Sequence, residues 1–186
     1  LELRLLQEQI NPHFLYNTLE IIVWLAESGD KEQVIQVVQS LSRFFRVVLS
    51  KGRAVVSLQE ELSCIQSYLY IQKVRYADIL NYEIQAEPEA LDCRIQKLSL
   101  QPLVENAVRY GADKRGQRSV SISAHGAGNS VEIAVTDKGP GFPMEAVKQL
   151  YSNEGKGSVG LKNVHRRLKS IYGEDNGLKI ESSQDG

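Results

Sequence analysis

The chain has 186 residues, 42% of them hydrophobic and 24% charged, a balance typical of a globular protein and not of a disordered chain, a fibrous repeat or a disulfide scaffold. Lys and Arg number 22 and Asp and Glu number 23, so the net charge is −1 and bulk electrostatics predicts no affinity for nucleic acid or anionic membranes. Any anionic ligand must be bound locally. We expect Cys64 and Cys93 to be free thiols, and no stretch has the about 20 apolar residues of a membrane span. Because the chain opens on Leu1 inside a helical pattern, we expect it to be part of a longer protein.

The first half of the chain predicts a helical hairpin. Residues 1–28 and 31–50 have helical periodicity, and Ser28-Gly29-Asp30 separates them. The expected apolar residues are Ile10, Phe14, Leu15, Leu19, Ile21, Ile22, Leu25 and Ala26 in the first helix, and Val34, Val37, Val38, Leu41, Phe44, Phe45 and Val48 in the second. Since these faces are too wide for one partner helix, we expect two hairpins to pair through Leu15, Leu19, Ile22, Leu41 and Phe45 into a homodimeric four-helix bundle.

The rest of the chain predicts a mixed α/β region. Ser57-Leu58-Gln59-Glu60 matches a capping box and starts a third helix that ends near Tyr76. The later pattern predicts, in order, a strand over 81–87, a helix over 98–110, a hairpin of two strands with its turn at 126–129, a glycine-rich stretch over 139–160, a helix over 161–171 and a strand over 178–182. The fold class is therefore α+β, with a helical domain over 1–76 and an α/β domain over 77–186.

Two glycine-rich segments could bind a nucleotide. Gly155-Lys156-Gly157-Ser158-Val159-Gly160 leads into a helix, so its backbone N–H groups and the Lys156 charge suit a phosphate; a flexible loop explains the segment equally well. Asp137-Lys138-Gly139-Pro140-Gly141 follows a strand, where an ordinary turn is the simpler interpretation. In the functional interpretation, Asp137 accepts a hydrogen bond from the adenine amino group.

Two further groups of polar residues lie on predicted helices. Glu105 and Asn106 fall mid-helix among apolar neighbours, where an Mg²⁺ ligand or a solvated helix face would account for Asn106. His13 falls on the polar arc of the first helix and is expected to be exposed. Asn17 follows it at i+4, so its amide can reach a group bound to the imidazole.

The joint order of these motifs resembles the sensor histidine kinases of two-component systems, in particular the LytS-like and YesM-like subfamily with its QxNPHFLFNTL box. Gln9 to Leu19 is similar to that phosphoacceptor box, and Gln101 to Gly111 to the N box. Asp137 to Phe142 and Gly155 to Val164 are similar to the two glycine boxes, so the resemblance spans essentially the whole chain.

The resemblance implies a dimerisation and phosphotransfer hairpin followed by a gyrase- and Hsp90-type ATP-binding α/β sandwich. ATP would be the phosphoryl donor, with Mg²⁺ as cofactor and a response regulator receiver domain as partner. His13 would be the phosphorylated residue, Asn106 the Mg²⁺ ligand and Asp137 the adenine anchor. Asn17 is a candidate catalytic residue because of its position beside His13. The resemblance does not say which group takes the imidazole proton, for which Glu20 and Glu105 are the candidates. The other implied nucleotide contacts are Arg109, Gly139, Gly141, Lys156, Gly157, Gly160 and Leu161.

The resemblance also implies a cytoplasmic domain of a membrane-anchored sensor, whose membrane spans and sensor would precede this segment. The chain departs from the usual pattern at Tyr110, where His is common, at Lys138, where Asn is common, and at Gln96-Lys97, where prolines are frequent. Two other functions stay open. One is a dimerisation module that only senses ATP, and the other is a gyrase- or Hsp90-type ATPase, although the Gln9 to Leu19 segment disfavours the latter.

Overall fold

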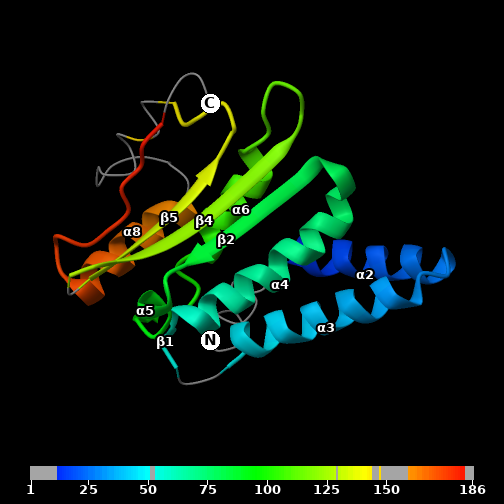
Figure 1. Ribbon diagram of the computed structural model, residues 1–186, viewed down its shortest axis with the longest axis horizontal. Coiled ribbons are helices and arrows are strands. Elements are labelled where there is room, and N and C mark those ends of the chain that lie inside the picture. Colours follow the sequence, from blue (N-terminus) through cyan, green and yellow to red (C-terminus); the bar gives the residue numbers. More distant parts are fainter. Residues whose placement is uncertain (1–11, 51–52, 129, 144–146, 148–158, 183–186) are drawn as a thin grey trace.

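The computed structural model of the chain describes residues 12–50, 53–128, 130–143, 147 and 159–182. Helices α2 (Pro12–Glu27) and α3 (Lys31–Val48) lie antiparallel and confirm the predicted hairpin (Figure 1). At their turn Gly29 adopts a φ of 80°, and the Asp30 side chain caps α3 by accepting a hydrogen bond from the backbone N–H of Gln33 at 3.0 Å. Residues 1–11, the first part of the helix predicted over 1–28, lie outside the described residues.

Helix α4 (Leu58–Tyr76) connects the hairpin to the rest of the molecule. It begins with the predicted capping box, in which Ser57 and Glu60 bond each other's backbone N–H groups. Apolar side chains are buried on several of its sides because α4 packs against α3 on one side and against the sheet on another (Figure 1). One continuous apolar core therefore runs from Phe14 in α2 to Ile122 in the sheet.

The main sheet has three strands, β2 (Leu80–Ala86), β4 (Arg118–Ala127) and β5 (Ser130–Asp137). Strand β4 is central, parallel to β2 and antiparallel to β5. The predicted turn at 126–129 is shorter than expected, because pairing continues to Ala127 opposite Ser130. A second, two-stranded sheet pairs β1 (Val55–Ser57) with β3 (Arg94–Gln96), and both strands are too short to give a periodic signal in the sequence.

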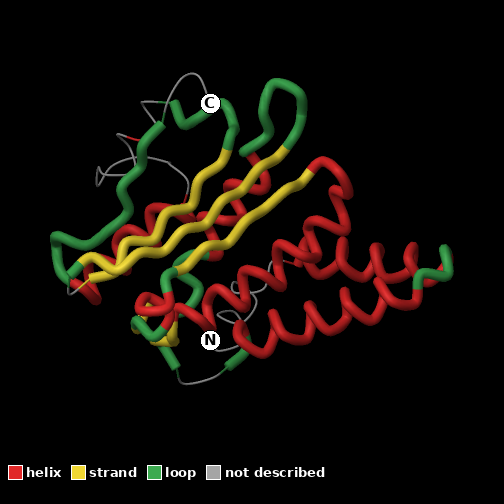
Figure 2. Tube along the Cα trace, in the orientation of Figure 1, coloured by secondary structure: helices red, strands yellow, loops and turns green. Residues whose placement is uncertain are grey.

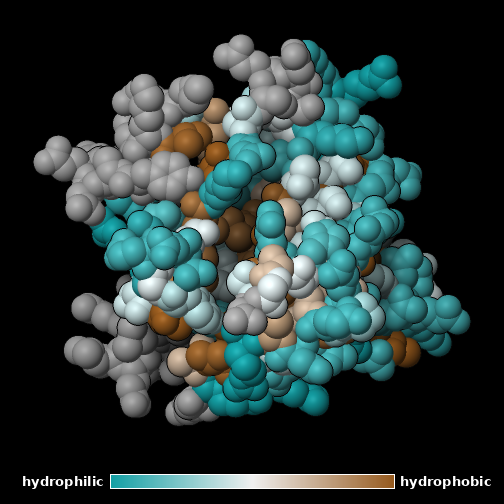
Figure 3. Space-filling model, turned by 60° about the vertical axis from the view of Figure 1, so that its left-hand side comes forward, coloured by the Kyte–Doolittle hydropathy of each residue, from teal (hydrophilic) through white to brown (hydrophobic). Residues whose placement is uncertain are grey.

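The molecule is built from a helical layer on one face of the sheet. Helices α4 and α6 (Gln101–Tyr110) contact the inner face, and α8 (Val159–Tyr172) packs on α6. Two short elements, η1 (Ala77–Ile79) and α5 (Pro88–Leu91), flank β2. The outer face of the three strands carries mostly polar side chains that are exposed or half-buried. Figure 3 brings forward the side that lies on the left in Figure 1; it is largely hydrophilic, and hydrophobic side chains gather in a hollow near its middle.

One expectation is wrong. Residues 178–182 form a loop and not a strand (Figure 2); the N–H of Leu178 donates to the His165 ring, and the Ser182 hydroxyl accepts from the N–H of Phe142. Leu19 and Ala26, on the predicted apolar face of α2, are exposed in the single chain, because the core side of α2 centres on Phe14. Leu19 is one of the residues predicted to pair with a second hairpin. None of the described helices is long and apolar enough to cross a membrane.

Candidate functional site

His13 lies in the first turn of α2 and is exposed, as the sequence predicts. The Asn17 amide nitrogen lies 3.0 Å from Nδ1 of His13 and 3.3 Å from Nε2, so it can donate to whichever ring nitrogen carries the lone pair. The helix holds these two side chains one turn apart on one face, and this contact orients the imidazole toward solvent.

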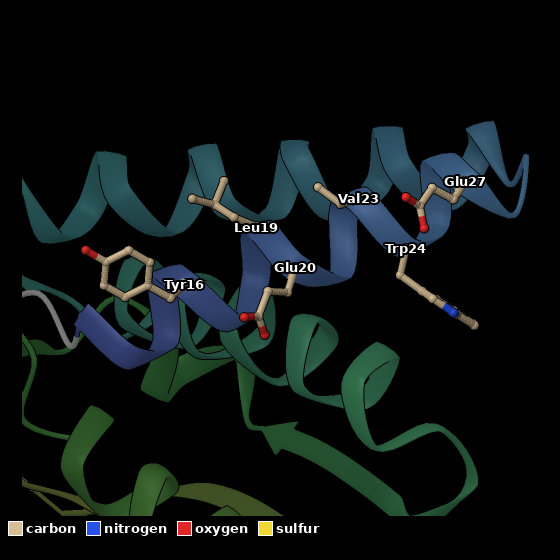
Figure 4. A pocket seen from close by; sticks show the side chains of 6 residues that line it. All are labelled: Tyr16, Leu19, Glu20, Val23, Trp24 and Glu27. Carbon is tan, nitrogen blue, oxygen red and sulfur yellow. The ribbon is translucent and has the colours of Figure 1, made fainter.

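The face of α2 that carries His13 continues as an open hollow along the helix. Its lining is Tyr16, Leu19, Glu20, Val23, Trp24 and Glu27, all from α2 (Figure 4). Four of these residues are large apolar side chains that are 46–67% exposed. A surface of this kind beside an exposed histidine suits contact with another protein.

Phe14 anchors the histidine's helix from the opposite side. Its ring is 5% exposed and lies 5.0 Å from the ring centroid of Phe44 in α3 and 5.1 Å from that of Tyr68 in α4. Because Phe14 is fixed by both neighbouring helices, the backbone of His13 is held in place while its side chain stays free to react.

The ends of α6 and β5 meet at a close-packed corner. Asp137 ends β5, and one of its carboxylate oxygens accepts a hydrogen bond from the N–H of Gly139 at 2.8 Å. A Cβ on Gly111 would lie 2.7 Å from the Asp137 Cβ, and a Cβ on Gly139 would lie 2.7 Å from the Gly111 Cα. Only glycines permit this approach, which brings the N box and the first glycine box together. Gly141 follows with a φ of 78°.

Helix α6 brings the remaining N-box residues to this corner. The Arg109 guanidinium lies 5.4 Å from the Tyr110 ring, which is 60% exposed. Arg118 of β4 donates to the carbonyls of Val108 at 2.7 Å and Arg109 at 3.0 Å, so a cation caps the C-terminal end of α6. The sequence does not predict the close contact of Gly111 with Asp137 or the cap by Arg118. The glycine at the end of the N box is a signal that could have indicated the close contact.

Glu105 is half-buried on α6. Its carboxylate accepts a hydrogen bond from the Gln101 amide at 2.9 Å, and burial raises the pKa of this carboxyl. Burial also raises the pKa of Tyr68 in α4, and the neighbouring Glu105 charge adds to that effect. The ring of Tyr68 in turn contacts Phe14, the residue that follows His13.

The start of α8 lies against the start of α6. A Cβ on Gly160 would lie 3.8 Å from the Pro102 Cβ, and Leu161 is 2% exposed within the packed interior. Lys156 and Gly157 of the second glycine box lie outside the described residues.

The corner has polar atoms that a nucleotide could use. A carboxylate has two acceptor oxygens, and the N–H of Gly139 bonds one oxygen of Asp137, so the other can accept from a ligand. Asn106 supplies a side-chain oxygen in the adjoining helix. Within the described residues no three acidic, His or Cys side chains cluster to hold a metal.

Comparison with known proteins finds two families along the chain. Residues 1–80 match the histidine kinase family, and residues 97–186 match the family of histidine kinase-, DNA gyrase B- and HSP90-like ATPases. The histidine kinase domain of a blue-light activated histidine kinase from Erythrobacter litoralis covers 99% of this chain with a TM-score of 0.53 at 17% identity, which supports the fold.

Three curated relatives align with essentially the entire chain. They are the sensor histidine kinase YesM of Bacillus subtilis at 38% identity, the sensor protein LytS of Oceanobacillus iheyensis at 36%, and the sensor histidine kinase YpdA of Escherichia coli at 38%. The alignments cover 99–100% of this chain but only 31–33% of those proteins, so the chain spans about one third of their length. On these matches and this fold, the chain belongs to the sensor histidine kinases of the LytS and YesM family.

Proposed function

We propose that the chain transfers the γ-phosphoryl group of ATP to His13 and then passes it to an aspartate of a response regulator. The observation that carries this proposal is the separation of two sites on one core. An exposed histidine lies on the hairpin, and the Asp137 carboxylate lies beside Gly111 and Gly139 at the ends of α6 and β5.

In this reaction a neutral imidazole nitrogen of His13 attacks the γ-phosphorus as the bond to the ADP oxygen breaks. Asn17 positions the ring before attack, because its amide nitrogen lies 3.0 Å from Nδ1 and can donate to the ring nitrogen that carries the lone pair. This hydrogen bond must break before that nitrogen attacks, since the other nitrogen carries the proton. Glu105 of α6 and Glu20 of α2 are the two candidates to accept the imidazole proton.

The nucleotide would be held at both ends of α6. Asp137 accepts from the adenine amino group, and Gly139 and Gly141 lie beside the base. Asn106, Arg109, Lys156 and the backbone of Gly157 to Leu161 bind the phosphate end. When bound, Mg²⁺ would offset the negative charge of the phosphates next to Asn106.

The proposed protein partners are inferred from the exposed surface of the hairpin. A second copy of the chain would pack on the exposed apolar residues to complete a four-helix bundle, and a receiver domain would dock beside His13. In this proposal residues 1–76 are the dimerisation and phosphotransfer domain and residues 77–186 the ATP-binding domain. The whole would be the cytoplasmic part of a membrane-anchored sensor.

The decisive experiment incubates the chain with γ-labelled ATP and Mg²⁺ and tests the stability of bound label. Phosphohistidine predicts label that is lost in acid and retained in base. ATP binding without label would instead indicate an ATP-sensing module, and released phosphate without label would indicate a gyrase- or Hsp90-type ATPase.

A further inference from the structure

The loop that leads into α6 is held by hydrogen bonds to a buried carboxylate. Glu61 of α4 is fully buried, and its two oxygens accept hydrogen bonds from the N–H of Leu98 at 2.9 Å and the N–H of Leu100 at 3.1 Å. Leu98 has a φ of 59°, a conformation that turns the loop's N–H groups toward one point. Glu61 therefore fixes the start of the helix that carries Asn106 and Arg109.

The same loop reaches back to the hairpin through Lys97. Its ammonium group donates to the carbonyl of Val48 at 2.9 Å, the carbonyl of Ser50 at 2.8 Å and the Ser50 hydroxyl at 3.1 Å. These groups lie at the C-terminal end of α3, where a cation also offsets the helix dipole. Lys97 thus ties α3 to α6 across about fifty residues of sequence.

We propose that Glu61 and Lys97 are positioning residues that lock the ATP-site helix α6 onto the phosphoacceptor hairpin, and that they set the rate of phosphoryl transfer and not the affinity for ATP. This inference rests on the proposed function. Lys97 replaces a residue that is frequently proline in the family pattern, and proline could not make these three contacts. The departure at position 97 therefore lies at the junction and not in the nucleotide corner.

A looser junction should change the rate of phosphoryl transfer and leave the affinity for ATP unchanged, for a geometric reason. ATP affinity depends on α6, β5 and the glycine boxes, which a looser junction leaves together. Transfer requires the His13 nitrogen and the phosphorus to meet within about 3–3.5 Å, so a looser junction lowers the fraction of molecules in reactive geometry. Burial lowers the pKa of Lys97 and raises that of Glu61, which is the signature of two charges taken out of water at this junction.

The test compares Lys97→Met with Lys97→Arg and with Lys73→Met, which removes an exposed ammonium group from α4. Lys97→Met should lower the rate of His13 phosphorylation at saturating ATP by roughly fivefold or more while the ATP Kd stays within about twofold. Lys97→Arg should recover most of the rate, and Lys73→Met should match the wild type. Glu61→Gln should act like Lys97→Met, because an amide can satisfy only one of the two N–H donors.

Hydrogen exchange gives a readout that does not depend on activity. Lys97→Met should speed exchange at the amides of Leu49 and Ser50 in the last turn of α3, and Lys73→Met should not. An unchanged or faster transfer rate in Lys97→Met, an equal loss of ATP affinity, or unchanged exchange at these amides would each overturn the inference. If the wild type acquires no histidine label, the proposed function fails, and the exchange experiment still tests the junction. Should Glu61→Gln fail to fold, Lys97→Met decides the result alone.

Discussion

The outer faces of the hairpin and of the sheet carry opposite kinds of exposed side chain. Helices α2 and α3 expose large apolar side chains, namely Tyr16, Leu19, Val23, Trp24, Ile35 and Val38. The outer face of the sheet instead exposes polar side chains such as Asn81, Glu83, Ser121, Glu132 and Thr136. The sheet layer is thus complete within one chain, whereas the hairpin presents a surface that suits a partner. The two regions differ in what they need from other molecules.

The largest expected effect concerns that apolar surface. Leu19→Glu should weaken self-association by roughly a hundredfold or more, because a two-fold interface would bury the new charge twice. Analytical ultracentrifugation measures this. Ala134→Glu, on the outer face of β5, places the same charge on the sheet and should leave association unchanged. A folded wild-type monomer at high micromolar concentration would contradict the contrast between the two faces.

The next effect separates the two faces of a single strand. Asp137→Asn, at the inner end of β5, should weaken ATP binding by roughly tenfold and reduce discrimination against GTP, because an amide can both donate to and accept from a base edge. Glu132→Gln on the outer face should bind ATP as the wild type does. Calorimetry with both nucleotides decides this, and equal ATP affinity in the two variants would remove Asp137 from the site.

A similar effect concerns the reverse reaction on the hairpin. The Asn17 amide lies beside His13 and could orient a water for attack on a regulator's phospho-aspartate. Asn17→Ala should then slow regulator dephosphorylation about tenfold, equivalent to about 1.4 kcal/mol of barrier, with ATP affinity intact. Gln39→Ala removes an exposed amide from α3 and serves as the control. Equal rates for both variants would leave Asn17 a purely structural role.

The smallest effect is on stability. Burial raises the pKa of Glu105 above its ordinary value of 4.5, so folding disfavours its charged form. The contribution of Glu105 to the free energy of unfolding is therefore complete below pH 4.5 and is lost as pH rises through the raised pKa. Glu105→Gln should raise Tm at pH 8 by about 2–4 °C and change it little near pH 4. Glu83→Gln, which removes an exposed carboxylate, should show neither effect; equal Tm changes at the two pH values would contradict the assignment.

The elements that the sequence predicts best are those whose signals are local. The Ser57 capping box, the turn at Gly29 and the alternation in β4 each depend on residues a few positions apart, and all three appear in the structure. The exposure of His13 also follows from its wheel position alone.

The features that could not be predicted depend on distant residues. The hydrogen bond from the N–H of Leu98 to the Glu61 carboxylate joins positions 37 residues apart, and no periodic pattern in the sequence indicates it. Residues 178–182 have a strand-like pattern but form a loop, and two hydrogen bonds join this loop to His165 and Phe142, which lie 13 and 40 residues away. Which apolar residues of α2 stay exposed in the single chain, Leu19 among them, depends on how much of the helix α3 and α4 cover, and a helical wheel does not contain that information.

The central claim is that the hairpin's exposed histidine receives the phosphoryl group, and a pair of variants tests it most directly. His13→Gln and His125→Gln each remove one exposed histidine, the first from α2 and the second from β4. We predict that His13→Gln abolishes acid-labile label from γ-labelled ATP while its ATP affinity stays that of the wild type, and that His125→Gln is labelled normally. Label of wild-type intensity on the His13→Gln chain would contradict the account.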